Sequence, residues 1–292
     1  MLELAPEYLY VNSLFARFFA LQAVHAARGI PSTQVVLAPR GMLGAGALRI
    51  KPVKKTAFLS LARWLRWFEG VRWHATTGLE RDEILRVFPH ATVAVASNIP
   101  SLAQRTTAND RMKEGVWKLV VLGRIHPKKN IEFGLRALEK ALEGQAFEVE
   151  VSLIGQAEDP EYLKRLMQYN SAGLRIQQLG AVRLDEVGPL LTASHFLLLP
   201  TLHENYGHAI VEAWAHGCPV FLSDQTPWRE LEAKQIGWDW PLDLESWVDG
   251  LRAALSQDRG EWQRQSVACM RFFEEAVRSP EVIEANRRIF SA

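Results

Sequence analysis

The sequence has few of the features that mark secreted, membrane-spanning or disulfide-bonded proteins. Its two cysteines, Cys218 and Cys269, are too few and too far apart for a disulfide framework or a cysteine zinc site. No apolar run approaches the ~18 residues that a helix needs to span a bilayer. The start of the sequence, MLELAPEYLY, lacks the basic stretch and apolar core of a signal peptide. We therefore expect a cytoplasmic protein.

Motifs for cofactors and metals are also absent. The chain has no G-x-G-x-x-G, so a dinucleotide cofactor is not indicated. His203 and His208 are five residues apart, which is the wrong spacing for one face of a helix, and no carboxylate or cysteine pattern completes a metal site. We expect no metal and no cofactor, and no nucleic-acid partner.

The composition is that of a globular protein of one large or two ordinary domains, with 292 residues, 48% apolar and 23% charged. A net charge of +1 hides an asymmetry, because residues 1–115 carry 15 Lys or Arg against 8 Asp or Glu, whereas residues 116–292 carry 19 against 25. A net +7 in the first part suggests that it faces phosphates or a membrane surface. Two ordinary solvated surfaces explain the same numbers equally well.

The second part of the chain alternates short apolar runs with helical patterns. A helix is predicted over 130–142, with Ile131, Leu135, Leu138 and Leu142 on one face, and another near 159–170. Strands alternating with helices at this pace indicate an α/β domain with a doubly wound parallel sheet. The predicted strands are 117–123, 149–155, 174–180, 195–200 and 218–223.

The first part is sparser. Three strands are predicted at 34–39, 71–76 and 91–97, with helices around 52–68 and near 78–88. Three strands make a thin parallel sheet, so we expect this domain to be incomplete. The polar, turn-rich stretch 98–115 is predicted to be a linker. The tail, 272–290, is predicted to form two helical pieces that break near Ser279 and Pro280.

Ligands of doubly wound sheets bind at the carboxyl ends of the strands, where loops lead into helices. The first such turn of the second domain is GRIHPKKN (123–130), which contains Arg124, Lys128 and Lys129. Its cations and the positive end of the following helix favour an anion, and a diphosphate is the obvious candidate. A solvated basic loop remains the alternative for this stretch taken alone.

A second turn, HENYGHAIVE (203–212), places Glu204 in a strand-end loop and Glu212 one turn into the next helix. Carboxylates suit the vicinal hydroxyls of sugars, and Gly207 lets a ligand approach the backbone where the helix begins. The spacing of the two glutamates is not informative by itself, because Glu150 and Glu158 have the same offset. The turn SDQTPW (223–228) would border the same crevice. Together these turns favour a nucleotide and sugar site.

In this order, GRIHPKKN, HENYGHAIVEAWAHGCPV and SDQTPW resemble the C-terminal domain of group 1 glycosyltransferases, glycosyltransferase family 4, which have the GT-B fold. The two glutamates resemble the E-x7-E motif of that family. The stretches LAPRGML (37–43) and WHATTGLE (73–80) resemble the acceptor-side domain of a bacterial branch. The resemblance extends from about Tyr8 to Phe290 and implies two Rossmann-like doubly wound domains facing a cleft.

The resemblance implies a role for each matching residue. Arg124 and Lys129 would hold the donor diphosphate, Glu212 the ribose hydroxyls and Glu204 the hydroxyls of the transferred sugar. The donor turns also include Gly123 and the backbone N–H groups of Tyr206, Gly207 and His208, while Arg40 and His74 would face the acceptor. The resemblance further implies retention of anomeric configuration without a metal, a nucleotide sugar linked to UDP or GDP as donor, and a glycan or lipid-linked acceptor in cell-surface polysaccharide synthesis.

The resemblance also predicts the domain organisation. Residues 1–115 would be a partial acceptor-side domain with the linker, 116–271 the donor-binding domain, and 272–292 a helical tail that packs back on the first domain. Family members begin with about three more strand–helix units and a glycine-rich loop, so the alternative is a truncated nucleotide-sugar-binding module without transfer activity. We expect apolar surface to remain open near Phe15, Phe18 and Phe19 and on the helix from Trp64 to Trp67, leading to self-association or to peripheral contact with the inner membrane face.

Overall fold

The computed structural model describes residues 6–49, 51–99, 115–169 and 171–291, and leaves the side chains of residues 17–19 and 45 undescribed. The chain forms two compact units. The first contains the chain up to Ile99 together with the segment from Arg278 onward, and the second is the part between them, which ends at Val277. Most of the predicted linker, 98–115, lies outside the described residues. No helix in the described part is both long enough and apolar enough to cross a membrane.

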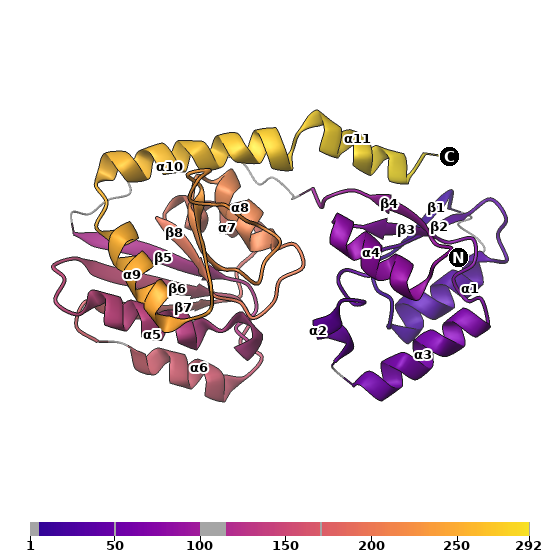
Figure 1. Ribbon diagram of the computed structural model, residues 1–292, viewed down its shortest axis with the longest axis horizontal. Coiled ribbons are helices and arrows are strands. Elements are labelled where there is room, and N and C mark those ends of the chain that lie inside the picture. Colours follow the sequence, from indigo (N-terminus) through magenta and orange to yellow (C-terminus); the bar gives the residue numbers. More distant parts are fainter. Residues whose placement is uncertain (1–5, 50, 100–114, 170, 292) are drawn as a thin grey trace. The chain divides into compact units, whose positions relative to one another are not determined.

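The second unit is built on a six-stranded parallel sheet in the order β10-β9-β8-β5-β6-β7 (Figure 1). Its strands are β5 (Val116–Leu122), β6 (Glu148–Ile154), β7 (Leu174–Gly180), β8 (Phe196–Leu199), β9 (Val220–Ser223) and β10 (Gly237–Trp240). The five predicted strands are confirmed, whereas β10 was missed. Its sequence, GWDW, is short and carries a charge, so periodicity does not reveal it.

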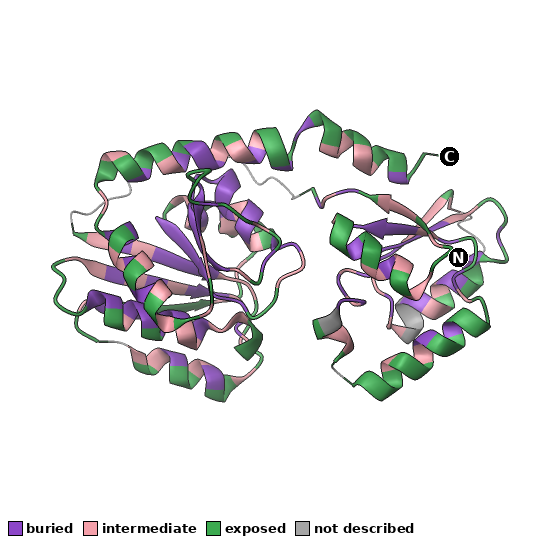
Figure 2. Ribbon diagram, viewed as in Figure 1, coloured by how far each residue is buried: buried purple, intermediate pink, exposed green. Residues whose placement is uncertain are grey.

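Helices cover both faces of this sheet. They are α5 (Ile131–Leu142), α6 (Pro160–Leu166), α7 (Leu184–Thr192), α8 (His208–Ala215), α9 (Leu244–Leu255) and α10 (Arg259–Phe272), with short helices η2 (Pro127–Lys129), η3 (Met167–Tyr169) and η4 (Phe273–Val277). Leu119 and Val121 of β5 pack with α5, α6 and α9, while the intervening Val120 packs with α8, α10 and η4. This alternation produces the continuous buried strands visible in Figure 2.

The amphipathic patterns of the helices agree with this packing. The four residues predicted to share a face of α5 are all buried. Ile210, Ala213 and Trp214 of α8 are fully buried, and the helix ends at Gly217, whose φ of +64° matches the left-handed conformation of a helix C′ residue. The second unit is therefore a doubly wound α/β domain, as predicted.

The first unit has a four-stranded parallel sheet in the order β1-β2-β3-β4, so the three predicted strands are confirmed and a fourth was missed. The additional strand is β1 (Tyr8–Val11), followed by β2 (Gln34–Leu37), β3 (Arg72–Ala75) and β4 (Thr92–Val95). Leu9 and Val11 of β1 face one core, and Tyr8 and Tyr10 face another. β1 is only four residues long, so its pattern is too short to distinguish a strand from the start of a helix.

Helices also lie on both faces of the first sheet. One face packs mainly against η1 (Arg17–Gln22), α1 (Ala23–Ala27), α3 (Pro52–Trp64) and α4 (Gly78–Val87), with α2 (Ala45–Leu48) preceding α3. The other face packs against α11 (Pro280–Ile289), whose Ile289 contacts the cluster around Val36 and Ala96. The helical break lies where it was predicted, because Ser279 caps α11 through its hydroxyl. Residues from both ends of the chain thus build one core.

Candidate nucleotide-sugar site

The strand order of the second unit creates a switch point between β5 and β8. From β5 the chain adds β6 and β7 on one side, then returns to add β8, β9 and β10 on the other. β5 and β8 pair directly, with Leu119 opposite Phe196. Loops that leave the carboxyl ends of two such strands diverge and leave a crevice for ligands. The turns 123–130 and 200–207, in which the sequence predicts most of the donor residues, start from these two strands.

Lys129 and Glu204 meet across this switch point. The Lys129 Nζ lies 2.6 Å from Oε2 of Glu204, with 24% and 19% of the side chains exposed. The two loops are also tied through backbone, because the carbonyl of Lys128 accepts from the Leu202 N–H at 3.0 Å and from the Thr201 hydroxyl at 3.2 Å. The structure thus brings one predicted cation of the first turn against the predicted sugar-binding carboxylate of the second.

Arg124 has a different partner, which the sequence analysis missed. Its Nη1 lies 2.8 Å from Oε1 of Glu158, in the turn after β6, and His126 lies 3.9 Å from the same carboxylate. Arg124 is 73% exposed, and an exposed pair of this kind contributes only about 0–1 kcal/mol. The sequence signal for this ion pair was that Glu158 lies in the turn at the end of β6, the strand that pairs with β5.

Glycines permit the close approach of these turns. Gly123 has φ +126° and donates its N–H to the Ile154 carbonyl at 2.9 Å. Gly155 has φ +141°, and a Cβ placed on it would lie 1.9 Å from the carbonyl oxygen of Gly123. The position of the Gly123–Arg124 backbone therefore depends on the absence of a side chain at residue 155.

The E-x7-E stretch is arranged around the start of α8. Gly207 is the N-cap of this helix in a left-handed conformation, φ +82°. Tyr206 is buried at 4% exposure, its carbonyl accepts from Nε1 of Trp228 at 2.6 Å, and burial raises the pKa of its phenol to about 12. The Tyr206 ring contacts both His208 and Trp228. Tyr206 is thus a packing side chain that fixes the loop, while His208 is exposed.

Glu212 lies one turn into α8 and is half-buried. Burial raises the pKa of its carboxyl group, and no donor among the described residues forms a hydrogen bond or ion pair with its side chain. The structure does not bring Glu212 into contact with Arg124 or Lys129. A partly desolvated carboxylate without a protein donor is suited to accept hydrogen bonds from ligand hydroxyls.

Arg40 and His74 lie in the first unit, in a network at the carboxyl ends of its strands. Arg40 follows β2 and donates to Asn12 at 2.6 Å, to the Tyr10 hydroxyl at 2.9 Å and to Asn98. The Tyr10 hydroxyl lies 2.6 Å from Nδ1 of His74, and Nε2 of His74 lies 2.8 Å from the Ala96 carbonyl oxygen. Asn12, Tyr10 and Asn98 were not predicted. They follow or belong to β1 and β4, which pair with strands distant in the sequence.

Burial lowers the pKa of His74, so the ring is neutral, donates from Nε2 to Ala96 and accepts from Tyr10 at Nδ1. Below its ordinary pKa of 6.5, the unfolded chain takes up a proton that the folded ring does not. The stability present above that pH is therefore lost as the pH falls through 6.5 toward the lower folded pKa.

We expect the titration of His74 to lower the unfolding free energy of the wild type as the pH falls from 6.5 toward the folded pKa. The decrease should be up to about 1.4 kcal/mol per pH unit. In His74→Gln this contribution to the slope of the unfolding free energy against pH should be absent. In His90→Gln, which changes an exposed histidine, the slope should be the same as in the wild type. Urea denaturation at a series of pH values between about 7 and about 5 measures both slopes. Equal slopes in wild type and His74→Gln would contradict the assignment of the neutral ring.

Within the described residues, no group of three or more His, Cys, Asp or Glu is placed to hold a metal ion. The pairings of Glu204 with Lys129 and of Glu158 with Arg124 show that these carboxylates face cations. Metal independence remains a prediction.

Comparison with known proteins finds relatives of the second unit. Residues 117–257 match a family model described as "Glycosyl transferases group 1". An uncharacterized glycosyltransferase of Methanocaldococcus jannaschii is 26% identical over 140 residues, which are 47% of this chain and 35% of that protein. The match therefore spans about a third of the length of this curated relative.

Solved structures resemble a larger part of the chain. WaaG, a glycosyltransferase involved in lipopolysaccharide biosynthesis, aligns with a TM-score of 0.71 at 14% identity, covering 95% of this chain and 84% of WaaG. HepE of Anabaena, solved in complex with UDP and glucose, aligns with a TM-score of 0.68 at 16% identity, covering 97% of this chain and 76% of HepE. At these identities the likeness shows the fold. This α/β chain therefore has the GT-B fold, and its residues 117–257 are similar to the group 1 glycosyltransferases.

Proposed function

We propose that this protein is a retaining glycosyltransferase that binds a nucleotide sugar at the carboxyl edge of its second sheet and transfers the sugar to a glycan or lipid-linked acceptor. The observation that carries the proposal is the state of Glu212. It is a half-buried carboxylate with a raised pKa and no protein donor among the described residues, on the helix that begins at Gly207. A pair of ribose hydroxyls would supply the donors that it lacks.

The charges around the switch point suit the diphosphate and the sugar. Lys129 would neutralise the diphosphate as it leaves, and its partner Glu204 would accept hydrogen bonds from the transferred sugar. Arg124 would exchange its weak, exposed pair with Glu158 for a charge-assisted bond to phosphate. These fixed cations would stabilise developing negative charge without a metal ion, which supports a metal-independent reaction.

The nucleotide, the sugar, the pathway and the acceptor side are proposed from the relatives. UDP is the first candidate nucleotide, because HepE was solved with UDP and glucose, and GDP is the second. A hexosyl donor and a role in cell-surface polysaccharide synthesis at the cytoplasmic side of the membrane are proposed from the family resemblance and from the involvement of WaaG in lipopolysaccharide biosynthesis. Arg40 and His74 would face the acceptor.

A nucleotide-sugar-binding module without transfer activity is the second candidate. It is favoured by the restriction of the family match to residues 117–257. Both candidates require donor binding, and only the first requires turnover. A donor-hydrolysis assay with UDP-glucose, run beside the binding measurement, separates them.

We expect UDP to raise the melting temperature of the chain. Glu212→Gln and Lys129→Ala should each weaken UDP binding by about 1.5–3 kcal/mol, because each removes charge-assisted hydrogen bonds to the ligand. Thermal denaturation over a UDP titration gives the apparent affinities. Glu150→Gln is the matched control, since Glu150 belongs to the other glutamate pair of the same offset but lies within β6.

The same titration with GDP, ADP and EDTA completes the test. The shift should survive EDTA, and its loss with EDTA and recovery with Mg²⁺ would refute metal independence. If none of the three nucleotides changes the melting temperature, or if Glu150→Gln weakens binding as much as Glu212→Gln, the donor site is assigned wrongly.

A further inference from the structure

The first unit contains a long segment without negative charge. Residues 8–68 include no Asp or Glu and carry nine Lys or Arg, although 33 acids in 292 residues would place about seven in a segment of this length. The net +7 of residues 1–115 therefore comes from one continuous stretch. A segment of this charge attracts an anionic partner.

Helix α3 lies in this segment and exposes apolar side chains to solvent. Val53 is 80% exposed, Trp64 78%, Leu65, just after the helix, 43%, and Leu61 42%. Leu59 and Ala62 occupy the opposite, buried face of the same helix. Since α3 already has a buried face, the exposed apolar residues are not needed for the core of the first unit.

The open surface differs from the one predicted. Trp64 is exposed as expected, but Trp67 is half-buried against Phe58, and Phe15 also contacts Phe58. The side chains of Phe18 and Phe19 lie outside the described residues. Exposed cations flank the apolar residues, including Lys54 in the first turn of α3 and Arg63 in the last. The exposed face of α3 is therefore both apolar and basic.

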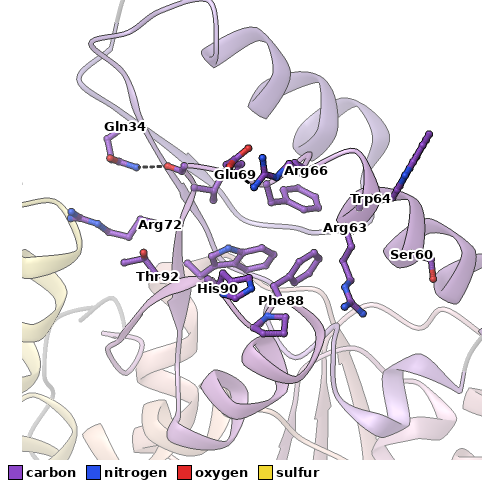
Figure 3. A pocket seen from close by; sticks show the side chains of 17 residues that line it. Gln34, Ser60, Arg63, Trp64, Arg66, Glu69, Arg72, Phe88, His90 and Thr92 are labelled. Atoms are coloured by element: carbon purple, nitrogen blue, oxygen red, sulfur yellow. Dashed lines mark hydrogen bonds and ion pairs between the residues drawn. The ribbon is translucent and has the colours of Figure 1, made fainter.

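A hollow of about 820 Å³ adjoins the end of α3 (Figure 3). Its floor is aromatic, with the rings of Phe68, Trp73 and Phe88 at 4.8–5.6 Å from one another. Gln34, Arg72 and Thr92, the first residues of β2, β3 and β4, line it. The hollow thus lies at the amino edge of the first sheet, whereas the Arg40–His74 network lies at the carboxyl edge.

The lining of the hollow carries an excess of positive charge. It includes Arg63, Arg66 and Arg72 but only one carboxylate, Glu69, which lies 3.5 Å from Arg66. Arg72 donates to the Ile289 carbonyl at 3.0 Å, whereas Arg63 has no acidic partner among the described residues. An apolar floor under a cationic rim matches a phospholipid, which combines a hydrocarbon chain with a phosphate.

We propose that the exposed face of α3 and the adjoining hollow form a docking surface for an anionic lipid bilayer. A nucleic acid would also be attracted by the acid-free segment. It would not, however, provide an apolar environment for aliphatic side chains such as Val53, Leu61 and Leu65. A bilayer interface accommodates tryptophan and aliphatic side chains beneath the headgroups while Lys and Arg remain at the phosphates. The combination of charge and exposed apolar residues therefore selects the bilayer. This inference does not depend on the proposed transfer activity.

Flotation of the whole chain with vesicles tests the surface. We expect binding to vesicles of phosphatidylcholine mixed with phosphatidylglycerol, little binding to pure phosphatidylcholine, and loss of binding as salt is raised. Lys54→Glu combined with Trp64→Ser should weaken vesicle binding roughly tenfold. Lys54→Glu places an acid in the first turn of a helix, where it is tolerated, so the variant should remain folded.

Arg264→Glu combined with Val267→Ser on α10 is the matched control, since both residues are exposed in the second unit. The control should bind vesicles as the wild type does, and both variants should keep the UDP-dependent rise in melting temperature. Equal binding to neutral and anionic vesicles, or equal loss in both variants, overturns the proposal. A dimer that light scattering detects in wild type and not in the α3 variant, without vesicle binding, assigns the surface to a second copy instead.

Discussion

Gly155→Ala is expected to destabilise the chain by at least about 3 kcal/mol, because the new methyl group meets backbone on a strained residue. Its Cβ would lie 1.9 Å from the Gly123 carbonyl oxygen and 2.6 Å from the Gly123 carbonyl carbon, and φ at residue 155 is +141°. No side-chain rotation can relieve a clash with backbone. The turn after β5 or the turn after β6 must therefore move, and the former carries Gly123 and Arg124.

Two other glycines separate the cost of backbone strain from the cost of a clash with backbone atoms. Gly144 has φ +74° with open space around it, so Gly144→Ala should cost only about 1 kcal/mol from backbone strain. Gly237→Ala should be as costly as Gly155→Ala, because its Cβ would lie 2.2 Å from the Val220 carbonyl oxygen with φ +142°. Urea denaturation gives the stabilities, and the UDP-dependent melting shift should fall in Gly155→Ala but persist in Gly237→Ala. A Gly155→Ala chain as stable as Gly144→Ala would show that the turns after β5 and β6 are not in close contact.

The sequence was most informative where local pattern and packing agree. Every predicted strand of the second unit is present, since buried parallel strands such as β5 and β8 are apolar on both faces. The sequence could not supply the strand order, which depends on pairs such as Leu119 with Phe196. That order determines that Lys129 meets Glu204 and that Arg124 meets Glu158. Partners of charged side chains were thus the least predictable feature of the candidate site.

The partners of the candidate residues in the first unit were also hard to predict, because they too depend on the strand order. Arg40 and His74 were singled out as strand-end residues, but their partners Tyr10, Asn12 and Asn98 lie 28–64 residues away from them in the sequence. Polar residues at the ends of short strands carry no periodic signal. Only the pairing of β1, β2, β3 and β4 in one sheet brings them together.

Glu80→Gln is expected to destabilise the first unit by roughly 2–4 kcal/mol, although the change is nearly isosteric. Glu80 is 1% exposed, and its two oxygens accept from the Gly41 N–H at 2.6 Å and from the N–H and hydroxyl of Thr76, both at 2.7 Å. A glutamine presents one oxygen and one NH2 group. Its NH2 must therefore face the N–H of either Gly41 or Thr76, which leaves a buried donor unsatisfied. Because Gly41 follows Arg40, the change should also loosen the Arg40 network.

Glu83→Gln, one turn further along α4, is the control and should have the opposite sign. Burial raises the pKa of the half-buried Glu83 carboxyl group, and the charge of Glu80 raises it further, so its ionised form is costly at neutral pH. Neutralising it should leave the unfolding free energy unchanged or increase it slightly. Urea denaturation of the two variants side by side measures the difference. If Glu80→Gln is no less stable than Glu83→Gln, the buried carboxylate is not what holds Gly41 and Thr76 in place at the carboxyl edge of the first sheet.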